Sequence, residues 1–134
     1  MTGDPARVAN GLVLLDSVII IDHLNGSNDA TTYLATVAER SLLSPITRAE
    51  VLAGVEPPDD EAVRQLLDRF HCVSIDPRIA DLAAELRRTW KWRLPDAFQA
   101  AVALSVGGQL ATRNTRDFNP SIHRFVIVPY TSAP

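Results

Sequence analysis

A chain of 134 residues, 46% of them apolar and 22% charged, has the composition of one folded domain with its own core, which excludes a disordered chain. Its apolar runs are too short to cross a bilayer, and its net charge of −3 excludes the uniformly basic surface of a general nucleic-acid-binding protein. The single cysteine, Cys72, excludes an internal disulfide and a zinc site made of several thiolates, and its apolar context, FHCVSI, predicts a core position.

Residues 1–10 predict a loose leader in front of one domain that spans residues 11–134. The leader lacks the uninterrupted apolar segment of a secretion signal, so we expect a cytoplasmic protein without a membrane contact. No repeat or linker divides the remaining residues, which predicts a single domain.

Short apolar runs alternate with helical patterns along the rest of the chain. The helical patterns begin at capping residues or prolines, and several end at a glycine or a polar turn. In chain order we expect a strand over 12–15, helices over 17–24 and 28–40, a short strand or connector over 41–44, helices over 45–54 and 61–70, a strand over 72–75, helices over 77–90 and 95–108, and strands over 109–113 and 125–130. This alternation predicts an α/β fold with a central parallel sheet, flanking helices and right-handed crossovers.

Four acidic residues fall near expected strand ends or on apolar helices. Asp16 ends the first expected strand between two apolar runs, and Asp117 closely follows the strand before the last. Asp96 lies in the first turn of the last expected helix, which is nearly all apolar, and Glu50 lies beside the apolar stripe of the third helix. Because ligands in open α/β sheets bind beyond the carboxyl ends of the strands, we expect these acids to converge on one cleft.

Each acid also has an ordinary structural explanation. Asp16 could cap the following helix, Asp96 could start its own helix, and Asp117 could be a turn residue. A bound divalent cation would explain the positions of all four acids together. Crowded carboxylates repel one another, and Mg²⁺ or Mn²⁺ prefers such hard oxygen ligands. Such an ion also binds phosphodiester oxygens and lowers the pKa of a bound water.

Four motifs in a fixed order carry a resemblance to a known family. They read LLDSVIIID, SPITRAEVLAG, LPDAFQAAVAL and LATRNTRDF, and they resemble the PIN domain, most closely the VapC-type toxins of bacterial toxin–antitoxin pairs. The resemblance runs from about Val13 to Pro129. It implies a PIN-like (Rossmann-like) single domain and an Mg²⁺- or Mn²⁺-dependent endoribonuclease, a hydrolase that leaves a 5′-phosphate and a 3′-hydroxyl.

The resemblance also implies the site residues and the partners. It places the catalytic and metal-binding acids on Asp16, Asp96, Asp117 and Glu50, with Glu50 binding the ion directly or through water, and the supporting polar groups on Ser17, Thr112 and Asn114. The implied partners are an RNA substrate, a VapB-type antitoxin that holds the toxin inactive, and a second copy of the chain in a homodimer.

Two positions depart from the family pattern. Val18 stands where serine or asparagine is common, and Gln99 interrupts DAFQAA where relatives usually carry an aliphatic residue. We expect neither side chain to touch the four acids.

The segment RRTWKWR interleaves cations with two tryptophans just before Asp96. Arginine and tryptophan can grip an RNA backbone and stack on unpaired bases, and they are also enriched at protein interfaces. A solvated basic helix end is the alternative explanation. The candidate contacts with RNA or a partner are Arg87, Arg88, Trp90, Lys91, Trp92 and Arg93.

Two other functions compete with the nuclease. A non-catalytic RNA- or protein-binding module on the same fold would bind without metal-dependent turnover. A phosphoryl-accepting receiver domain also clusters acids at strand ends, but it needs a lysine near the last strand, and the only lysine here is Lys91.

Overall fold

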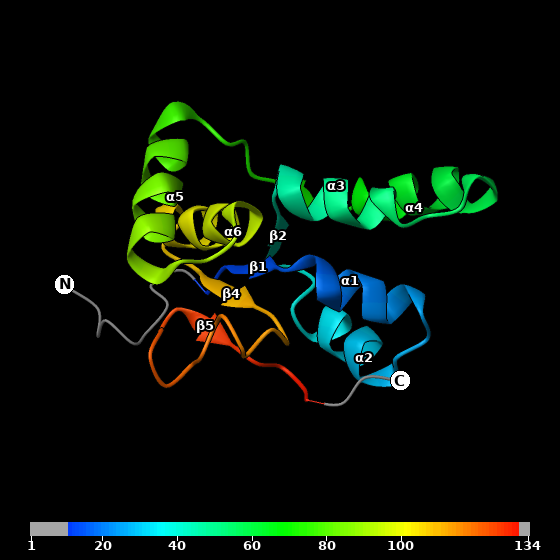
Figure 1. Ribbon diagram of the computed structural model, residues 1–134. Coiled ribbons are helices and arrows are strands. Elements are labelled where there is room, and N and C mark those ends of the chain that lie inside the picture. Colours follow the sequence, from blue (N-terminus) through cyan, green and yellow to red (C-terminus); the bar gives the residue numbers. More distant parts are fainter. Residues whose placement is uncertain (1–10, 132–134) are drawn as a thin grey trace.

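The computed structural model describes residues 11–131 and shows a central sheet with helices on both faces (Figure 1). Within these residues the sheet has five strands, all paired in parallel, in the order β3-β2-β1-β4-β5. The strands are β1 (Val13–Leu15), β2 (Ser41–Leu43), β3 (His71–Cys72), β4 (Gln109–Ala111) and β5 (Val126–Ile127). The predicted α/β fold with a parallel sheet is confirmed, and the expected leader over residues 1–10 lies outside the described residues.

The helices begin at the caps and prolines that the sequence indicates. They are α1 (Ser17–Leu24), α2 (Asn28–Thr36), α3 (Pro45–Ala53), the 3₁₀ turn η1 (Pro57–Asp59), α4 (Asp60–Leu67), α5 (Pro77–Trp90) and α6 (Leu94–Ser105). Helix α2 was expected to reach about residue 40 but ends at Thr36, because the chain turns there and the backbone of Arg40 pairs with Val13 at the start of β1. None of the helices in residues 11–131 has the length and hydropathy needed to cross a lipid bilayer.

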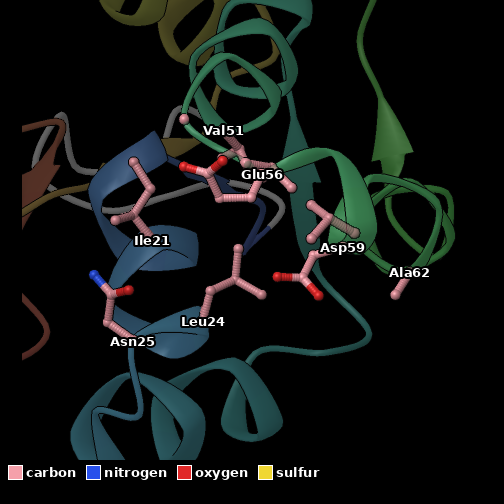
Figure 2. Close-up of a pocket in the computed structure, with 10 residues that line it drawn as sticks. Ile21, Leu24, Asn25, Val51, Glu56, Asp59 and Ala62 are labelled. Atoms are coloured by element: carbon pink, nitrogen blue, oxygen red, sulfur yellow. The ribbon is translucent and has the colours of Figure 1, made fainter.

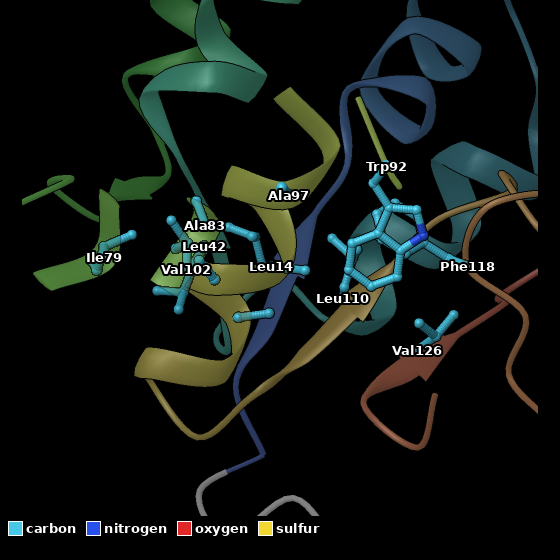
Figure 3. Close-up of a cluster of buried hydrophobic side chains, with 13 residues drawn as sticks. Leu14, Leu42, Ile79, Ala83, Trp92, Ala97, Val102, Leu110, Phe118 and Val126 are labelled. Atoms are coloured by element: carbon cyan, nitrogen blue, oxygen red, sulfur yellow. The ribbon is translucent and has the colours of Figure 1, made fainter. Parts of the chain in front are cut away.

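Side chains of the central strand β1 alternate between two hydrophobic cores. Leu14 packs with residues of α5 and α6 on one face (Figure 3), whereas Val13 and Leu15 pack with residues of α1 to α4 on the other. All three side chains are fully buried. A strand covered on both faces reads as a continuous apolar run, which is why VLL could be recognised as a strand despite its length.

The outer strand β3 corrects two predictions. It comprises only His71–Cys72 rather than residues 72–75, and Cys72 is exposed rather than in the core. The neighbouring apolar residues Val73 and Ile75 provide the packing against the core, while the two strand residues lie at the open edge of the sheet. An apolar context therefore indicated a buried segment here but not which of its residues is buried.

Register between the two central strands sets the position of the site. Leu15 pairs with Ala111, so Asp16 and Thr112 leave the sheet side by side at its carboxyl edge. Gly108, just before β4, is required for this close pairing, because a Cβ there would lie 2.7 Å from the carbonyl oxygen of Leu12.

Candidate functional site

Asp16 is a buried carboxylate at the junction of β1 and α1, only 6% exposed. Its Oδ1 accepts the backbone N–H of Ser17 at 2.9 Å, and its Oδ2 accepts the Thr112 hydroxyl at 2.6 Å. Burial raises the pKa of the Asp16 carboxyl, and the hydrogen bonds from Thr112, Ser17 and Gln99 act against this rise. Asp16 therefore caps its helix and also faces a polar network at the end of the sheet.

The other predicted polar residues extend this network from two sides. From α3, Glu50 accepts the hydroxyl of Ser17 at 2.9 Å. In the turn after β4, the Asn114 side chain donates to Asp117 at 3.1 Å, and the Asn114 backbone N–H donates to the Thr112 hydroxyl at 3.0 Å. Ser17, Thr112 and Asn114 thus each connect directly to one of the acids, as expected for groups that orient carboxylates.

Asp96, in the first turn of α6, lies within electrostatic range of the other three acids. Its pKa is raised to about 6, first by burial and then by the negative charges of Asp16, Asp117 and Glu50, while Arg93 opposes the rise. Like charges shift a pKa in this way only when they are near one another. The charges of three other acids, from the β1–α1 junction, from α3 and from the turn after β4, therefore act on Asp96.

The four carboxylates lie near one another, but their oxygen atoms do not meet at a single binding point. Within residues 11–131, no group of three or more Asp, Glu, His or Cys side chains lies close enough together to hold a metal ion without other ligands. Mg²⁺ keeps several waters and takes only one or two carboxylates directly in many sites, so a loose set of oxygen donors suits it. The donor chemistry, oxygen only and strongly negative, fits a hydrated divalent cation and does not fit a thiolate-bound metal.

Because the pKa of Asp96 is about 6, cation binding at this site should weaken as the pH falls through 6. A proton competes with the ion for the carboxylate below that pH, so the Kd for Mn²⁺ should rise by about tenfold per pH unit. Titration of the protein with Mn²⁺ at pH values from 5 to 7.5 measures this. The Asp96→Asn variant is the control and should lose the pH step; a wild-type Kd that stays constant across the range would contradict the prediction.

Three polar residues of the network were not predicted as site residues. Gln99 of α6 is 1% exposed and contacts Asp16, which corrects the expectation that it would not touch the acids. Ser44 and Thr47, at the start of α3, are fully buried and bind Gln99. A glutamine inside a run of alanines and valines was the one sequence signal that could have pointed to this network.

Asp22, a further acid of α1, does not join the cluster. It is buried and accepts two hydrogen bonds from the Arg113 guanidinium, at 2.6 and 2.9 Å, and one from the Tyr130 hydroxyl. The bonds from Arg113 hold the pKa of Asp22 below its usual value. The bonds of Asp22 with Arg113 and Tyr130 connect α1 to the segments that follow β4 and β5, so the role of Asp22 is structural.

The basic segment before Asp96 divides into buried and exposed parts. Trp92 is only 3% exposed, and its indole N–H donates to the backbone oxygen of Asp117 at 2.9 Å, so its expected role as a surface contact is wrong. Trp90 is 43% exposed and stacks on Trp92 with a ring separation of 5.9 Å. Arg87, Arg88, Lys91 and Arg93 are all exposed. Lys91 has a left-handed backbone (φ 65°), which ends α5 between the two tryptophans.

A groove of about 500 Å³ lies between α1 and the segment that runs from α3 to α4 (Figure 2). Ile21 and Leu24 line its α1 side and are 37% and 41% exposed, although both are large and apolar. The opposite side carries Val51 and the carboxylates of Glu56 and Asp59. Val51 directly follows Glu50, so the groove lies against the same two helices that supply Ser17 and Glu50 to the acidic site.

Comparisons with known proteins agree with this architecture. The model of the PIN domain family matches residues 13–119. Ribonuclease VapC19 of Mycobacterium tuberculosis is 29% identical over 113 residues, which cover 78% of this chain and 90% of that protein. A toxin–antitoxin complex from Klebsiella pneumoniae contains a chain that is 32% identical, with a TM-score of 0.84 and coverage of 90% of this chain and 99% of that one. FitAcB from Neisseria gonorrhoeae shares the fold at 23% identity, with a TM-score of 0.74 and coverage of 88% and 98%.

Proposed function

Because the chain belongs to the PIN domain family, we propose that it is the toxin of a toxin–antitoxin pair and an endoribonuclease that hydrolyses RNA phosphodiester bonds. The observation that carries the proposal is that Asp96 lies partly buried within reach of the charges of Asp16, Asp117 and Glu50, so that burial and then these charges raise its pKa to about 6. The similarity to a ribonuclease and to a chain of a toxin–antitoxin complex supports the same conclusion.

Mg²⁺ or Mn²⁺ is the cofactor of this proposal, held by Asp16, Asp96 and Asp117, with Glu50 acting directly or through water. When bound, such an ion supplies an activated water and stabilises charge on the scissile phosphate. The chain's own polar groups keep the acids in place: Thr112 holds Asp16, Ser17 holds Glu50, and Asn114 holds Asp117. Fixed carboxylates of this kind lose little freedom when they bind a cation, which favours binding.

Cleavage of a synthetic single-stranded RNA by the purified protein tests the function. We expect cleavage with Mg²⁺ or Mn²⁺, its loss in EDTA, its return when Mn²⁺ is added in excess, and products that carry a 5′-phosphate and a 3′-hydroxyl. Binding of the RNA without any metal-dependent product would favour the alternative, a non-catalytic binding module. Cleavage that continues unchanged in EDTA would overturn the metal-dependent mechanism.

Arg93 is an exposed cation next to the candidate site. It precedes α6 directly, its charge lowers the pKa of Asp96, and it forms none of the ion pairs in the part of the chain that the structure describes. Contact with a substrate phosphate would neutralise it, with the half-exposed indole of Trp90 as a stacking surface nearby. Arg93→Gln should therefore raise the KM for RNA by about fivefold with little change in kcat, as expected for one exposed ion pair. Arg69→Gln, on an exposed loop after α4, is the matched control.

The partners in this proposal are an antitoxin and a second copy of the chain. The apolar groove beside α1, with Glu56 and Asp59 at its rim, suits a helical antitoxin segment that carries apolar side chains and a basic residue. A partner in the groove would contact α1 and α3 and could thereby shift Ser17 and Glu50, which lie on these two helices. Analytical ultracentrifugation of the isolated protein tests the expected homodimer. The proposal also includes a cytoplasmic location, because the RNA that the toxin would cut lies there.

A further inference from the structure

Gln99 is a polar residue in the least exposed part of the molecule. It lies on α6 one turn after Asp96, between Phe98 and the fully buried Ala100, and it is itself 1% exposed. Burying an amide is costly unless its hydrogen bonds are made, and this one makes them to three residues of two segments, Ser44 and Thr47 at the start of α3 and Asp16 after β1. Such a residue is expected to serve a specific structural or functional need.

The orientation of the Gln99 amide follows from its neighbours. The Thr47 hydroxyl donates its one proton to the carbonyl oxygen of Leu15 at 2.8 Å, so it can only accept from Gln99, whose Nε2 lies 2.7 Å away. The Ser44 hydroxyl accepts two backbone N–H groups at the start of α3 and donates to Gln99 Oε1 at 2.5 Å. The Gln99 amide nitrogen therefore faces Thr47 and Asp16, and its second proton is directed at Asp16 Oδ1, 3.4 Å away.

This donor changes which oxygen of Asp16 is available. A carboxylate oxygen has two acceptor directions. Among residues 11–131, Oδ1 receives the N–H of Ser17 and, at the longer distance of 3.4 Å, the amide of Gln99, whereas Oδ2 receives only the hydroxyl of Thr112. Oδ1 is thus occupied on both sides, and Oδ2 keeps one free direction.

We propose that Gln99 is a positioning residue of this chain: it occupies Asp16 Oδ1, so that Asp16 offers a cation a single oxygen, Oδ2, in a fixed orientation. The proposal rests on the proposed metal-dependent function. It also connects the acids to one another, because Gln99 ties the helix of Asp96, through Ser44 and Thr47, to the helix of Glu50. An aliphatic residue at this position would fill the space without supplying the donor.

Mn²⁺ binding to the purified protein, followed by the EPR signal of the free ion, tests the proposal without relying on catalysis. Gln99→Met removes the donor and keeps an unbranched side chain of similar size, and it should weaken Mn²⁺ binding by about tenfold. Thr47→Val removes the hydrogen bonds of the Thr47 hydroxyl with Leu15 and Gln99 in the same buried network but leaves Gln99 able to reach Asp16. We expect both variants to lower the Tm, and only Gln99→Met to weaken Mn²⁺ binding strongly. Gln65→Met, on the exposed face of α4, controls for the substitution itself.

Wild-type affinity in Gln99→Met, or an equal loss in Thr47→Val, would overturn the proposal, since the donor to Asp16 would then not be what matters. If Gln99→Met does not fold, Gln99→Ile replaces it, with the same expected loss. A wild-type protein that binds no Mn²⁺ would instead overturn the proposed function on which this inference rests.

Discussion

Asp16→Asn is expected to lower the rate of Mg²⁺-dependent RNA cleavage by at least about 100-fold. The substitution removes one negative charge next to Asp96 and replaces one carboxylate oxygen with an amide nitrogen, which cannot bind a cation. It preserves the size of the side chain and a hydrogen-bond acceptor for the Ser17 N–H, so the helix cap and the fold should survive. A steady-state cleavage assay, with circular dichroism to verify folding, measures the effect.

Asp81→Asn is the matched control for this variant, because Asp81 is exposed on α5 and outside the acidic site. It should cleave RNA at the wild-type rate. Growth of cells that express each variant provides a second readout, with arrest expected for wild type and Asp81→Asn only. Folded Asp16→Asn protein that still cleaves RNA at the wild-type rate would remove Asp16 from the catalytic site.

Leu24→Glu is expected to weaken antitoxin binding by more than about tenfold while leaving RNA cleavage unchanged. Leu24 lies in the groove beside α1, where a carboxylate would have to be buried against an apolar partner and beside Glu56 and Asp59. Leu24 lies at the end of α1, about two helical turns from Asp16, and its side chain lines the groove, so the chemistry should be preserved. Calorimetric titration of the toxin with its antitoxin measures the affinity.

Leu104→Glu tests whether the effect belongs to the groove. Leu104 of α6 is 40% exposed, almost the same as Leu24 at 41%, but it lies on a different surface. It should bind the antitoxin as the wild type does. Equal loss in both variants would indicate a general effect of added charge, and unchanged binding in Leu24→Glu would show that the antitoxin docks elsewhere.

The sheet could be predicted from the sequence because its signals are local. Apolar runs such as VLL at Val13–Leu15, caps such as Ser44 and Asp76, and the prolines that start helices each act within a few residues. The order of the acids along the chain is also local information. Their convergence was predictable in outline from the rule that strand ends of a parallel sheet share one edge.

The polar network around Asp16 could not be predicted in the same way. Gln99 reaches Ser44, Thr47 and Asp16 over sequence separations of 55, 52 and 83 residues. No local pattern encodes such contacts, and the substitution of a glutamine for an aliphatic residue indicated only that something unusual occurs there. The hydrogen bonds themselves depend on how α3 and α6 pack against the end of β1.

The tryptophans illustrate a second limit. Trp90 and Trp92 lie in the same basic stretch and looked equivalent, yet one is half-exposed and the other is core. The left-handed turn at Lys91 separates them, and the contact of Trp92 with Asp117 lies 25 residues away in sequence. The charged neighbours in the sequence predicted that both tryptophans are exposed, and this prediction is correct for Trp90 and wrong for Trp92.

Diffraction from crystals soaked in Mn²⁺, recorded for the anomalous signal of manganese, tests most directly whether the four acids form one cation site. The proposed function predicts an anomalous peak bordered by Asp16, Asp96 and Asp117, with Glu50 within reach of the ion or of its bound water. The same soak of Asp16→Asn crystals should give no peak there. A strong peak elsewhere, with none between these carboxylates at pH 7.5, would contradict the account.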